Sequence, residues 1–431
     1  MAAATGAPRF LPDELVAEVL LRLPSKSLAR FRCVCRSWNN LVSSDAFQRL
    51  YYQYQQQAVV GSNGRQLQLK FAAARLAPPH RWEFDGFSVV PCEDCPRFIG
   101  AKPCHRGVAL LGRQCVGVFT VCNLSTGGFL HLPPCRTSGF PYVTGIGYHS
   151  AAHEYKVVQL ASMTNRPIWE SLDCQVLTVG DSRGWRPPSG QLDSALPNIL
   201  IENMMDPVFA NGCLHWTLVT VLLLRDKPEG ILSFSLADES FATVPLPPFV
   251  TDDLVPYDTN HPYIDSVRSD ACTPDYRLVS QPIGTALAEL DGCLCMIRDL
   301  RCRHNAASMF EVWKLKDYES GVWSLDYRIN LAGSMANKLM RTWLVLPICY
   351  LPLHSDSSQE NRKIVLATTA HDVHIYDPQT CTLETIASVV HDGNYSRSQD
   401  NPLYLLWYQE SLVHMAGMEY ISSHVYACML C

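Results

Sequence analysis

The stretch LPDELVAEVLLRLPSKSLARFRCVCRSWNNLV, residues 11–42, carries more apolar side chains than so short a segment can bury by itself. Its beginning, Leu11-Pro12-Asp13-Glu14, is typical of a helix start, because proline is tolerated in the first turn and carboxylates favour the positive end of the helix dipole. Apolar residues then recur at steps of three and four, which predicts a helix with one apolar stripe: Leu15, Val16, Val19, Leu20 and Leu23.

Further short helical patterns follow the proline at position 24. Ser25 can cap a second helix that carries Leu28 and Phe31. A third apolar series lies on a segment whose other face is polar: Val34, Trp38, Leu41 and Val42. The pattern predicts three short helices, or two with a break. Because a unit of roughly 40 residues is near the lower size limit for independent stability, we expect part of this apolar surface to face another protein. The alternative is a helical cap packed on the following domain.

Three motifs in this segment resemble the F-box in order and spacing. They are Leu11-Pro12, the Leu23-Pro24 pair followed by Lys26-Ser27-Leu28, and Val34-Cys35-Arg36-Ser37-Trp38 with the trailing Leu41. The resemblance implies that the segment docks into the Skp-family adaptor of a Skp-cullin-F-box ubiquitin ligase. The positions that match the adaptor-facing apolar residues of the family are Leu11, Pro12, Val19, Leu23, Pro24, Leu28, Val34, Cys35 and Trp38.

Docking of this kind sets apolar helix faces against a groove of the partner, with Trp38 and the two leucine-proline turns as expected anchors. The segment is also locally basic within a chain of net charge -6, through Arg22, Lys26, Arg30, Arg32 and Arg36. Such a charge would favour an acidic partner surface and speed the encounter. For any single arginine the alternative is a solvated helix face.

The composition of the whole chain predicts a soluble, intracellular protein. Its 431 residues are 47% hydrophobic and 18% charged, so we expect a sizeable core. No basic stripe alternates with aromatic residues, and nothing in the composition favours a nucleic acid or an anionic membrane as partner. The N-terminus lacks a signal-peptide pattern, and the longest apolar runs, residues 216–224 and 344–353, are too short to span a bilayer. We therefore expect a cytoplasmic or nuclear location and free thiols at the 18 cysteines, many of them buried.

From about residue 65, short runs rich in β-branched and aromatic residues alternate with turn residues, which predicts an all-β domain. A unit of strand, polar turn and strand, often followed by a proline stop, occurs five times, with turn markers at Ser125, Asp181, Asp238, Asp317 and Asp377. Subtraction of the residue numbers gives separations of 56, 57, 79 and 60 residues. Another β-like segment precedes most copies, so each unit has three or four strands.

This spacing is near that of a kelch-type propeller blade. Each blade is a small twisted sheet that cannot bury both faces alone, so packing around a ring supplies the core. We expect six blades, with seven as the alternative. The sixth blade can be assembled from LYLLWYQESLVHMAG, residues 403–417, and an N-terminal strand from residues 66–76 or 80–90. The ring would then close by pairing the two ends of the chain.

The segment GIGYHSAAHEYKVVQL, residues 145–160, resembles the G-x-G-Y-D-x-x-x-x-x-Y-K-V-V signature of the F-box-associated, kelch-like domain of plant F-box proteins. GCLHW at 212–216, followed by ILSFSLADESFATVPLPP at 231–248, resembles the next blade of that domain. His149 stands where the signature commonly has aspartate, and we expect no loss of the fold from this difference. The resemblance implies that the β-domain is the recognition half of the protein.

Together the patterns predict a disordered N-terminus at 1–8, an F-box helical domain at 9–50, a linker at 51–64 and an F-box-associated β-propeller domain at 65–431. The long step between two turn markers contains a polar, acidic and proline-interrupted segment, residues 249–284. Loops on rigid scaffolds often carry recognition, so this segment is a candidate target-binding loop, with a disordered insertion as the alternative.

Short motifs give little reason to expect an enzyme, because GxxxxGK[ST], HExxH and GxGxxG are absent from the sequence. GxSxG occurs once, at residues 180–184, but it lies in the turn of a predicted strand-turn-strand unit and not in the strand-to-helix turn that a nucleophilic serine needs. Four possible zinc ligands lie close together, but ordinary loop thiols are the favoured interpretation: Cys92, Cys95, Cys104 and His105. Cys302 and His304 form a weaker pair. The ending Cys428-Met429-Leu430-Cys431 has the C-a-a-X form without a polybasic patch, so buried thiols are favoured over lipidation. We expect no metal, no cofactor and no catalytic residue.

The sequence therefore predicts a non-catalytic receptor subunit. Its F-box would dock the Skp-family adaptor and, through it, the cullin, while the propeller holds an unidentified target protein for ubiquitination and degradation. The contribution of such a chain is proximity and orientation. Two alternatives stay open: an F-box scaffold that acts outside the ligase, and a propeller enzyme or lectin with a helical cap.

Overall fold

The computed structural model describes residues 12–44, 46–51, 54, 70–77, 81–84, 87–89, 102–103, 107–113, 118–123, 125–135, 142–162, 172–190, 207–216, 230–248, 285–301, 308–340, 345–351, 362–368, 372–388, 404–408 and 411–420. Several earlier predictions lie outside these residues: the disordered N-terminus, the 249–284 loop, both groups of possible zinc ligands and the C-terminal four residues. Among the described helices none is long and apolar enough to cross a membrane.

Three short helices form the N-terminal part, as predicted: α1 (Asp13–Leu21), α2 (Ser25–Phe31) and α3 (Arg36–Ser43). Residues 46–51 are also helical. Tyr51, which was expected to begin a linker, is instead buried among these helices, and its hydroxyl donates to the carbonyl of Leu23 at 3.1 Å. A linker that starts at residue 51 is therefore wrong, because this ring fills the helical core. We call residues 12–51 the helical domain.

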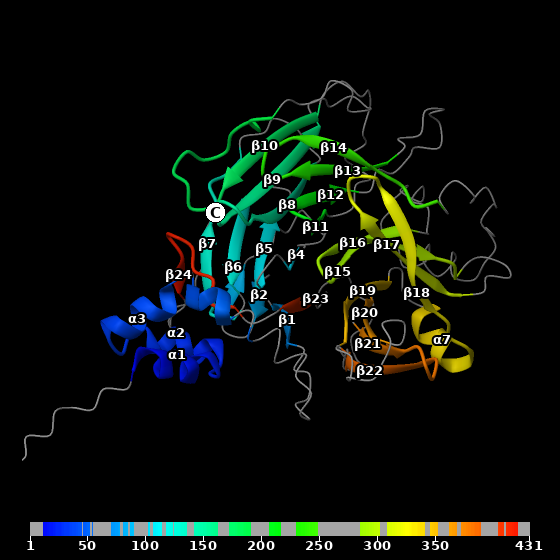
Figure 1. The fold of residues 1–431 in the computed structure, drawn as a ribbon, viewed down its shortest axis with the longest axis horizontal. Coiled ribbons are helices and arrows are strands. Elements are labelled where there is room, and N and C mark those ends of the chain that lie inside the picture. Colours follow the sequence, from blue (N-terminus) through cyan, green and yellow to red (C-terminus); the bar gives the residue numbers. More distant parts are fainter. Residues whose placement is uncertain are drawn as a thin grey trace, which may run out of the picture.

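Antiparallel sheets arranged around a common centre make up the rest of the described chain (Figure 1). The first blade has the order β24-β7-β6-β5-β4 and the second the order β10-β9-β8. Their strands are β4 (Lys102–Pro103), β5 (Val108–Arg113), β6 (Val118–Asn123), β7 (Gly128–His131), β8 (Tyr142–His149), β9 (Glu154–Ser162), β10 (Leu172–Thr178) and β24 (Glu419–Tyr420). Strand β8 runs through His149, so the fold is kept at this departure from the family signature.

The third, fourth and fifth blades each pair four strands in chain order. Helix α7 (Gly333–Met340) connects the last two of them. Their strands are β11 (Val208–Ala210), β12 (Cys213–Trp216), β13 (Gly230–Ser235), β14 (Phe241–Pro245), β15 (Thr285–Leu290), β16 (Cys293–Asp299), β17 (Phe310–Asp317), β18 (Val322–Ile329), β19 (Val345–Tyr350), β20 (Ile364–Thr368), β21 (Asp372–Asp377) and β22 (Thr382–Ser388).

A sixth sheet joins the two ends of the β-domain, in the order β23-β1-β2-β3. It pairs β23 (Tyr404–Tyr408) with β1 (Lys70–Ala77), and continues through β2 (Arg81–Phe84) and β3 (Phe87–Val89). The predicted ring closure is therefore confirmed. Only the backbone of this sheet is described, so side-chain packing supports five blades, one fewer than the six expected, plus this closing sheet.

Four of the five predicted hairpins are formed at the expected turns. The fifth, in the second blade, is not a full hairpin, because the chain after β10 pairs back through a single bridge between Val176 and Arg186. In two turns an aspartate at the end of the first strand accepts the backbone N–H two residues later: Asp317 from Glu319 and Asp377 from Gln379, each at 3.0 Å. In the first blade this role belongs to Asn123, which accepts the N–H of Ser125 at 2.9 Å. Ser125 lies within this turn, as expected of a turn marker, and Asn123, two residues before it, closes the turn.

The core lies between neighbouring blades, where one apolar cluster fills each of the four described interfaces. The two glycines of the family signature allow close approach here. A Cβ at Gly145 would lie 2.5 Å from Cγ of Pro207, and a Cβ at Gly147 would lie 2.5 Å from Cδ1 of Leu236. Buried cysteines fill space in the blades as predicted, and burial raises the pKa of Cys122 to about 12.

Two tryptophans connect successive blades by hydrogen bonds to prolines of the preceding blade. Trp185 donates its indole N–H to the carbonyl of Pro133 at 2.7 Å, and Trp323 donates to the carbonyl of Pro245 at 2.8 Å. Pro133 follows β7 of the first blade, and Pro245 is the last residue of β14 in the third. A buried indole such as that of Trp323 needs a partner for its N–H, and the proline carbonyl of the preceding blade provides one.

Candidate functional site

Helix α1 has apolar residues on two of its faces. Pro12 precedes the helix in an extended conformation, which fixes how the chain enters it. Val16 and Leu20, four residues apart, face the core of the helical domain. Leu15 and Val19, also four residues apart, are 48% and 57% exposed. Side chains at this spacing share one face of a helix, so α1 carries a second apolar stripe that its own domain does not cover.

A second exposed apolar segment lies between α2 and α3. Pro24 precedes α2 in an extended conformation, and Cys35 precedes α3 in the same way. The Cys35 Sγ atom accepts the backbone N–H of Trp38 at 3.4 Å and so caps α3. Val34, immediately before this cap, is 61% exposed. The cap holds the turn in a form that leaves the valine side chain in solvent.

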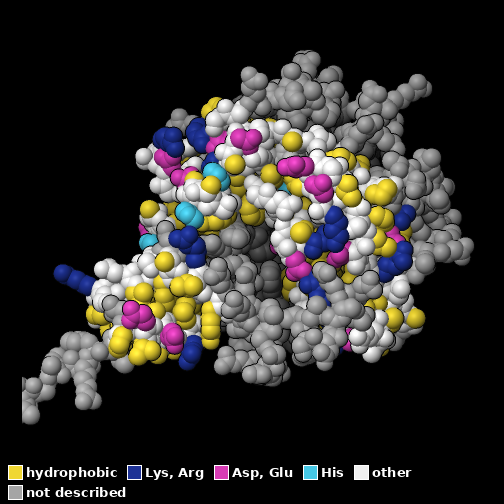
Figure 2. All heavy atoms as spheres, viewed as in Figure 1, with side chains coloured by type: hydrophobic (Ala, Val, Ile, Leu, Met, Phe, Trp, Pro, Cys, Tyr) yellow, Lys and Arg dark blue, Asp and Glu magenta, His cyan; other side chains and the backbone are white. Residues whose placement is uncertain are grey.

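The core of the helical domain is nevertheless already filled. Its fully buried side chains are Leu20, Leu28, Val42, Phe47 and Tyr51, together with Leu412 from the C-terminal part of the chain. The ring of Trp38 packs on that of Phe31, with the ring centroids 5.5 Å apart. Figure 2 shows apolar side chains gathered over the helices on the outer side as well. The outward residues are therefore surplus to the fold of this domain.

The nine residues that the F-box resemblance assigned to adaptor binding differ in their exposure to solvent. Five of them are exposed: Pro12, Val19, Pro24, Val34 and Cys35. Leu23 and Trp38 are half-buried and also pack on the core of the helical domain. Leu28 requires a correction, because it is fully buried in that core and offers no surface to a partner. Leu11 lies outside the described residues.

Two exposed leucines were missing from that assignment. Leu15 belongs to the outward stripe of α1, and its spacing from Val19 was a signal that the sequence contained. Leu50, on the helical residues 46–51, is also exposed, and no motif pointed to it. Of the five basic residues, four are exposed: Arg22, Lys26, Arg30 and Arg36. Arg32 is half-buried and donates through Nε to Oδ1 of Asn39 at 3.4 Å.

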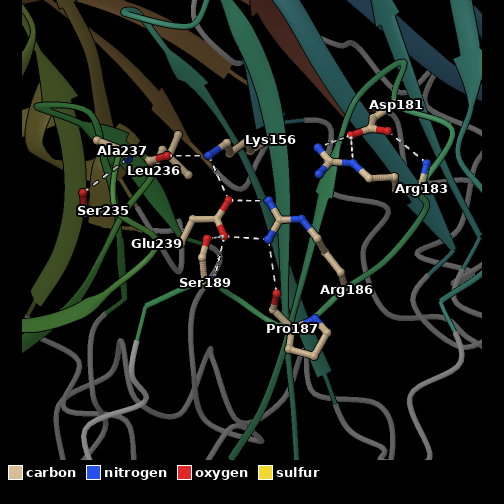
Figure 3. Close-up of polar contacts among 10 residues, drawn as sticks. All are labelled: Lys156, Asp181, Arg183, Arg186, Pro187, Ser189, Ser235, Leu236, Ala237 and Glu239. Atoms are coloured by element: carbon tan, nitrogen blue, oxygen red, sulfur yellow. Dashed lines mark hydrogen bonds and ion pairs between the residues drawn. The ribbon is translucent and has the colours of Figure 1, made fainter.

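Among the described residues of the propeller, a dense polar cluster surrounds Glu239 at the boundary between the second and third blades (Figure 3). Lys156, from the Y-K-V-V part of the signature, donates to Oε1 at 2.9 Å and to the Leu236 carbonyl at 2.7 Å. Arg186 binds both carboxylate oxygens at 2.6 Å, and Ser189 donates its N–H and its hydroxyl to Oε2. Sequence reasoning missed this cluster, because its members come from three separate turns and strands.

The charged groups in this cluster form ion pairs with one another. Burial favours the neutral form of the Glu239 carboxyl, but the hydrogen bonds from Arg186, Ser189 and Lys156 outweigh it and hold its pKa well below the usual range. Glu239 itself has positive φ, at 54°. The side chain thus links the second blade to a tight turn of the third, and its charge is already neutralised by partners. This is the arrangement of a structural contact between blades.

A buried histidine makes a comparable contact at the next boundary. The Nε2 atom of His215 lies 2.8 Å from the hydroxyl of Tyr318 in the fourth blade. Burial lowers the pKa of His215 to about 4, so the ring is neutral at physiological pH. Within the described ranges, no group of three or more His, Cys, Asp or Glu side chains is placed to hold a metal ion.

Comparison with known proteins gives two family matches in the same chain. Residues 10–50 match the F-box domain, and residues 95–261 match the F-box associated beta propeller domain. The first match contains all three helices, and the second contains the signature with Gly145, Gly147 and Lys156 as well as Glu239.

Similar proteins are found in Arabidopsis thaliana. One F-box protein is 26% identical over an alignment of 271 positions, which covers 54% of this chain and 60% of that protein, so this chain spans less than two thirds of it. A second F-box protein is 27% identical over 260 residues, 53% of this chain and 65% of that protein. An F-box/kelch-repeat protein is 58% identical over 40 residues, 9% of this chain and 11% of that protein.

Among solved structures, a puromycin hydrolase mutant aligns with 74% of this chain and 45% of its own, at 13% identity and a TM-score of 0.36. A likeness this low carries no functional argument. The two domain matches, the relatives and the fold agree: the chain belongs to the plant F-box proteins in which an F-box-associated β-propeller domain follows the F-box.

Proposed function

We propose that this protein is the substrate-recognition subunit of a Skp-cullin-F-box ubiquitin ligase. In this role the F-box docks a Skp-family adaptor and, through it, a cullin, while the propeller holds a target protein for ubiquitination. The chain itself is non-catalytic and acts in the cytoplasm, the nucleus or both. The observation that carries the proposal is the outward apolar surface of the helical domain, made of Leu15, Val19 and Val34, on a unit whose core is already filled.

Energetics favour a protein partner for this surface. Full burial of a valine or leucine side chain contributes about 1.5 to 3 kcal/mol relative to exposure. Three such side chains, two on α1 and one between α2 and α3, therefore suffice as anchors for a groove-binding interface. The exposed Arg22, Lys26 and Arg36 add positive charge to this domain, which suits an acidic partner surface. Because Leu15, Val19 and Val34 are exposed and lie outside the core cluster of the helical domain, a purely structural role does not account for them.

The polar contacts of the propeller support the non-catalytic part of the proposal. Glu239 and His215 have strongly shifted pKa values, which often mark active sites. Here both groups connect one blade to the next, and each has its hydrogen-bonding partners within the fold. Their shifts are therefore accounted for by the stability of the ring, which leaves the propeller as a rigid scaffold for holding a target.

The test measures binding of the purified full chain to a purified Skp-family adaptor by calorimetry. Val19→Glu and Val34→Glu each place a carboxylate on the outward surface, and each should weaken binding by at least about tenfold. Val322→Glu is the matched control, because this valine is 53% exposed but lies on the propeller. It should bind like the native chain.

These substitutions are sharper than Trp38→Ala, because the ring of Trp38 also packs on Phe31 inside the helical domain. Thermal unfolding of each variant checks that its fold is unchanged. If the native chain does not bind the adaptor, or if Val322→Glu weakens binding as much as Val19→Glu does, the proposal is refuted.

A further inference from the structure

Residues 411–418, near the C-terminal end of the chain, lie between the helical domain and the first blade. In Figure 1 this segment, in red, runs between the helices and β7, and β24 after it pairs with β7. We call residues 411–418 the strap. The strap is almost 400 residues from α1 in the sequence, yet its residues contribute to two hydrophobic cores. No sequence motif assigned a role to this contact.

The strap supplies apolar side chains to both domains at once. Leu412 is buried in the core of the helical domain, beside Leu20 and Leu28. The next residue, Val413, is buried in the cluster between the first two blades, as are Met415 and Met418. Two neighbouring side chains of the strap thus reach two different cores. The helical domain therefore completes its core only with a residue that the propeller holds in place.

Asn123, at the end of β6, holds the strap on the propeller side. Its Nδ2 atom lies 3.2 Å from the Ser411 carbonyl, 3.1 Å from the Ser411 hydroxyl and 2.9 Å from the Val413 carbonyl. Its Oδ1 atom accepts the N–H of Ser125, which closes the β6–β7 turn. Asn123 is fully buried, so loss of its amide donors would leave strap carbonyls without partners.

Three buried serines extend this contact to the helices. The backbone N–H of Ser411 donates to the hydroxyl of Ser125 at 3.0 Å. The hydroxyl of Ser25, the first residue of α2, donates to the carbonyl of Ser125 at 3.4 Å. All three residues are buried. The polar path thus runs from the strap to the turn of the first blade and on to the F-box.

The equivalent turns of other blades show that the asparagine is not needed for the turn itself. Asp317 and Asp377 close their turns with the same bond to the backbone two residues later. An aspartate could therefore close the turn at position 123, but it has no N–H to donate to the strap. The amide donors of Asn123 serve the strap alone.

We propose that the strap is a clamp that fixes the F-box on the first blade, so that the helical domain and the propeller move as one rigid body. If the proposed ligase function holds, the clamp sets the distance and orientation between the bound adaptor and the target. Asn123 and Leu412 are then positioning residues: they touch neither partner but determine where each is presented.

The experiment compares the native full chain with Asn123→Asp, which keeps the turn acceptor and removes the strap donors. Asp317→Asn is the matched control, because it makes the reverse exchange in a turn of the fourth blade. Donor and acceptor fluorophores are placed at Glu18 of α1 and Glu319 of the β17–β18 turn through genetically encoded amino acids, and single-molecule energy transfer reports their separation. Both positions are exposed.

The native chain and Asp317→Asn should give one narrow distribution of energy transfer. Asn123→Asp should broaden it or add a second population, and amide hydrogen exchange in α1–α3 should become at least about tenfold faster. Leu412→Ala keeps every hydrogen bond of Asn123 and should have the same effect through the lost apolar contact. If Asn123→Asp also unfolds the first blade, Leu412→Ala is the variant that tests the clamp. Native distributions and native exchange in Leu412→Ala would overturn the clamp.

Adaptor binding is measured separately on the native chain. Its absence would refute the ligase function while the energy-transfer result still decides whether the clamp exists. The two failures are therefore distinguishable.

Discussion

Replacement of Glu239 by glutamine should destabilise the protein far more than removal of its partner Lys156. In the native protein the Glu239 carboxylate accepts bonds from Lys156, Arg186 and Ser189. Glutamine keeps the shape of the side chain but removes the negative charge. The buried Lys156 ammonium and the partly buried Arg186 guanidinium would then face each other across a neutral amide.

The expected magnitudes follow from which charge is left without compensation. Removal of one member of a buried ion pair typically costs about 3 to 5 kcal/mol, because the other charge stays buried. Glu239→Gln should therefore lower the free energy of unfolding by about 3 kcal/mol or more. Lys156→Met removes a cation but leaves the carboxylate bonded to Arg186 and Ser189, so its cost should be about 1 to 2 kcal/mol. The double variant should cost less than the sum of the two.

Urea unfolding at pH 7, followed by tryptophan fluorescence, gives the three free energies. A further check uses pH, because the folded-state pKa of Glu239 lies below its ordinary value of 4.5. The native state then binds fewer protons than the unfolded state, so the contribution is complete above that value and is lost as the pH falls below it. Glu239→Gln should remove this acid dependence. Equal costs for the two single variants, or strict additivity in the double variant, would refute the reasoning.

Three further substitutions test other contacts between blades. Gly147→Ala puts a Cβ 2.5 Å from Leu236 and should cost about 1 to 3 kcal/mol in urea unfolding, whereas no loss would show that the two blades can separate freely. His215 has a folded pKa of about 4 against 6.5 unfolded, so the unfolded state binds a proton first and stability should fall by up to about 3 kcal/mol as the pH drops from 6.5 toward 4; His215→Gln should bind up to one proton fewer on unfolding near pH 5. Trp323→Phe leaves the Pro245 carbonyl without its indole donor and should lower stability by about 1 kcal/mol, while a melting temperature equal to the native value would contradict the role of this bond.

Much of the architecture could be predicted because turns and alternating strands leave local signals. The aspartates at 317 and 377 bond to their own turns, so their spacing reports the hairpins directly. The pairing of β23 with β1 was also predictable, since a ring of blades needs its ends joined and only a strand near residue 405 was left over. Local signals of this kind do not fix the number of blades, because each one reports a single hairpin and not how many sheets complete the ring.

Contacts between distant segments could not be predicted in the same way. Lys156 looked like one polar residue of a strand, and Glu239 like one carboxylate of a turn. Their pairing depends on how two blades pack, and no spacing within either segment encodes it. The same holds for Leu412, whose side chain enters the core of a domain at the other end of the chain.

The division of the F-box residues follows from the geometry of one short helix. Two apolar pairs at a spacing of four, Leu15 with Val19 and Val16 with Leu20, lie side by side on α1, and a domain this small can cover only one of them. The inner pair is satisfied by Leu28 from α2 and Leu412 from the strap. This packing buries Leu28, which the F-box motif had assigned to the adaptor, and leaves Leu15 and Val19 in solvent. The intact chain thus keeps Leu15 and Val19 exposed on a domain that the strap holds in one orientation. A surface that docks a partner in a fixed direction requires both properties.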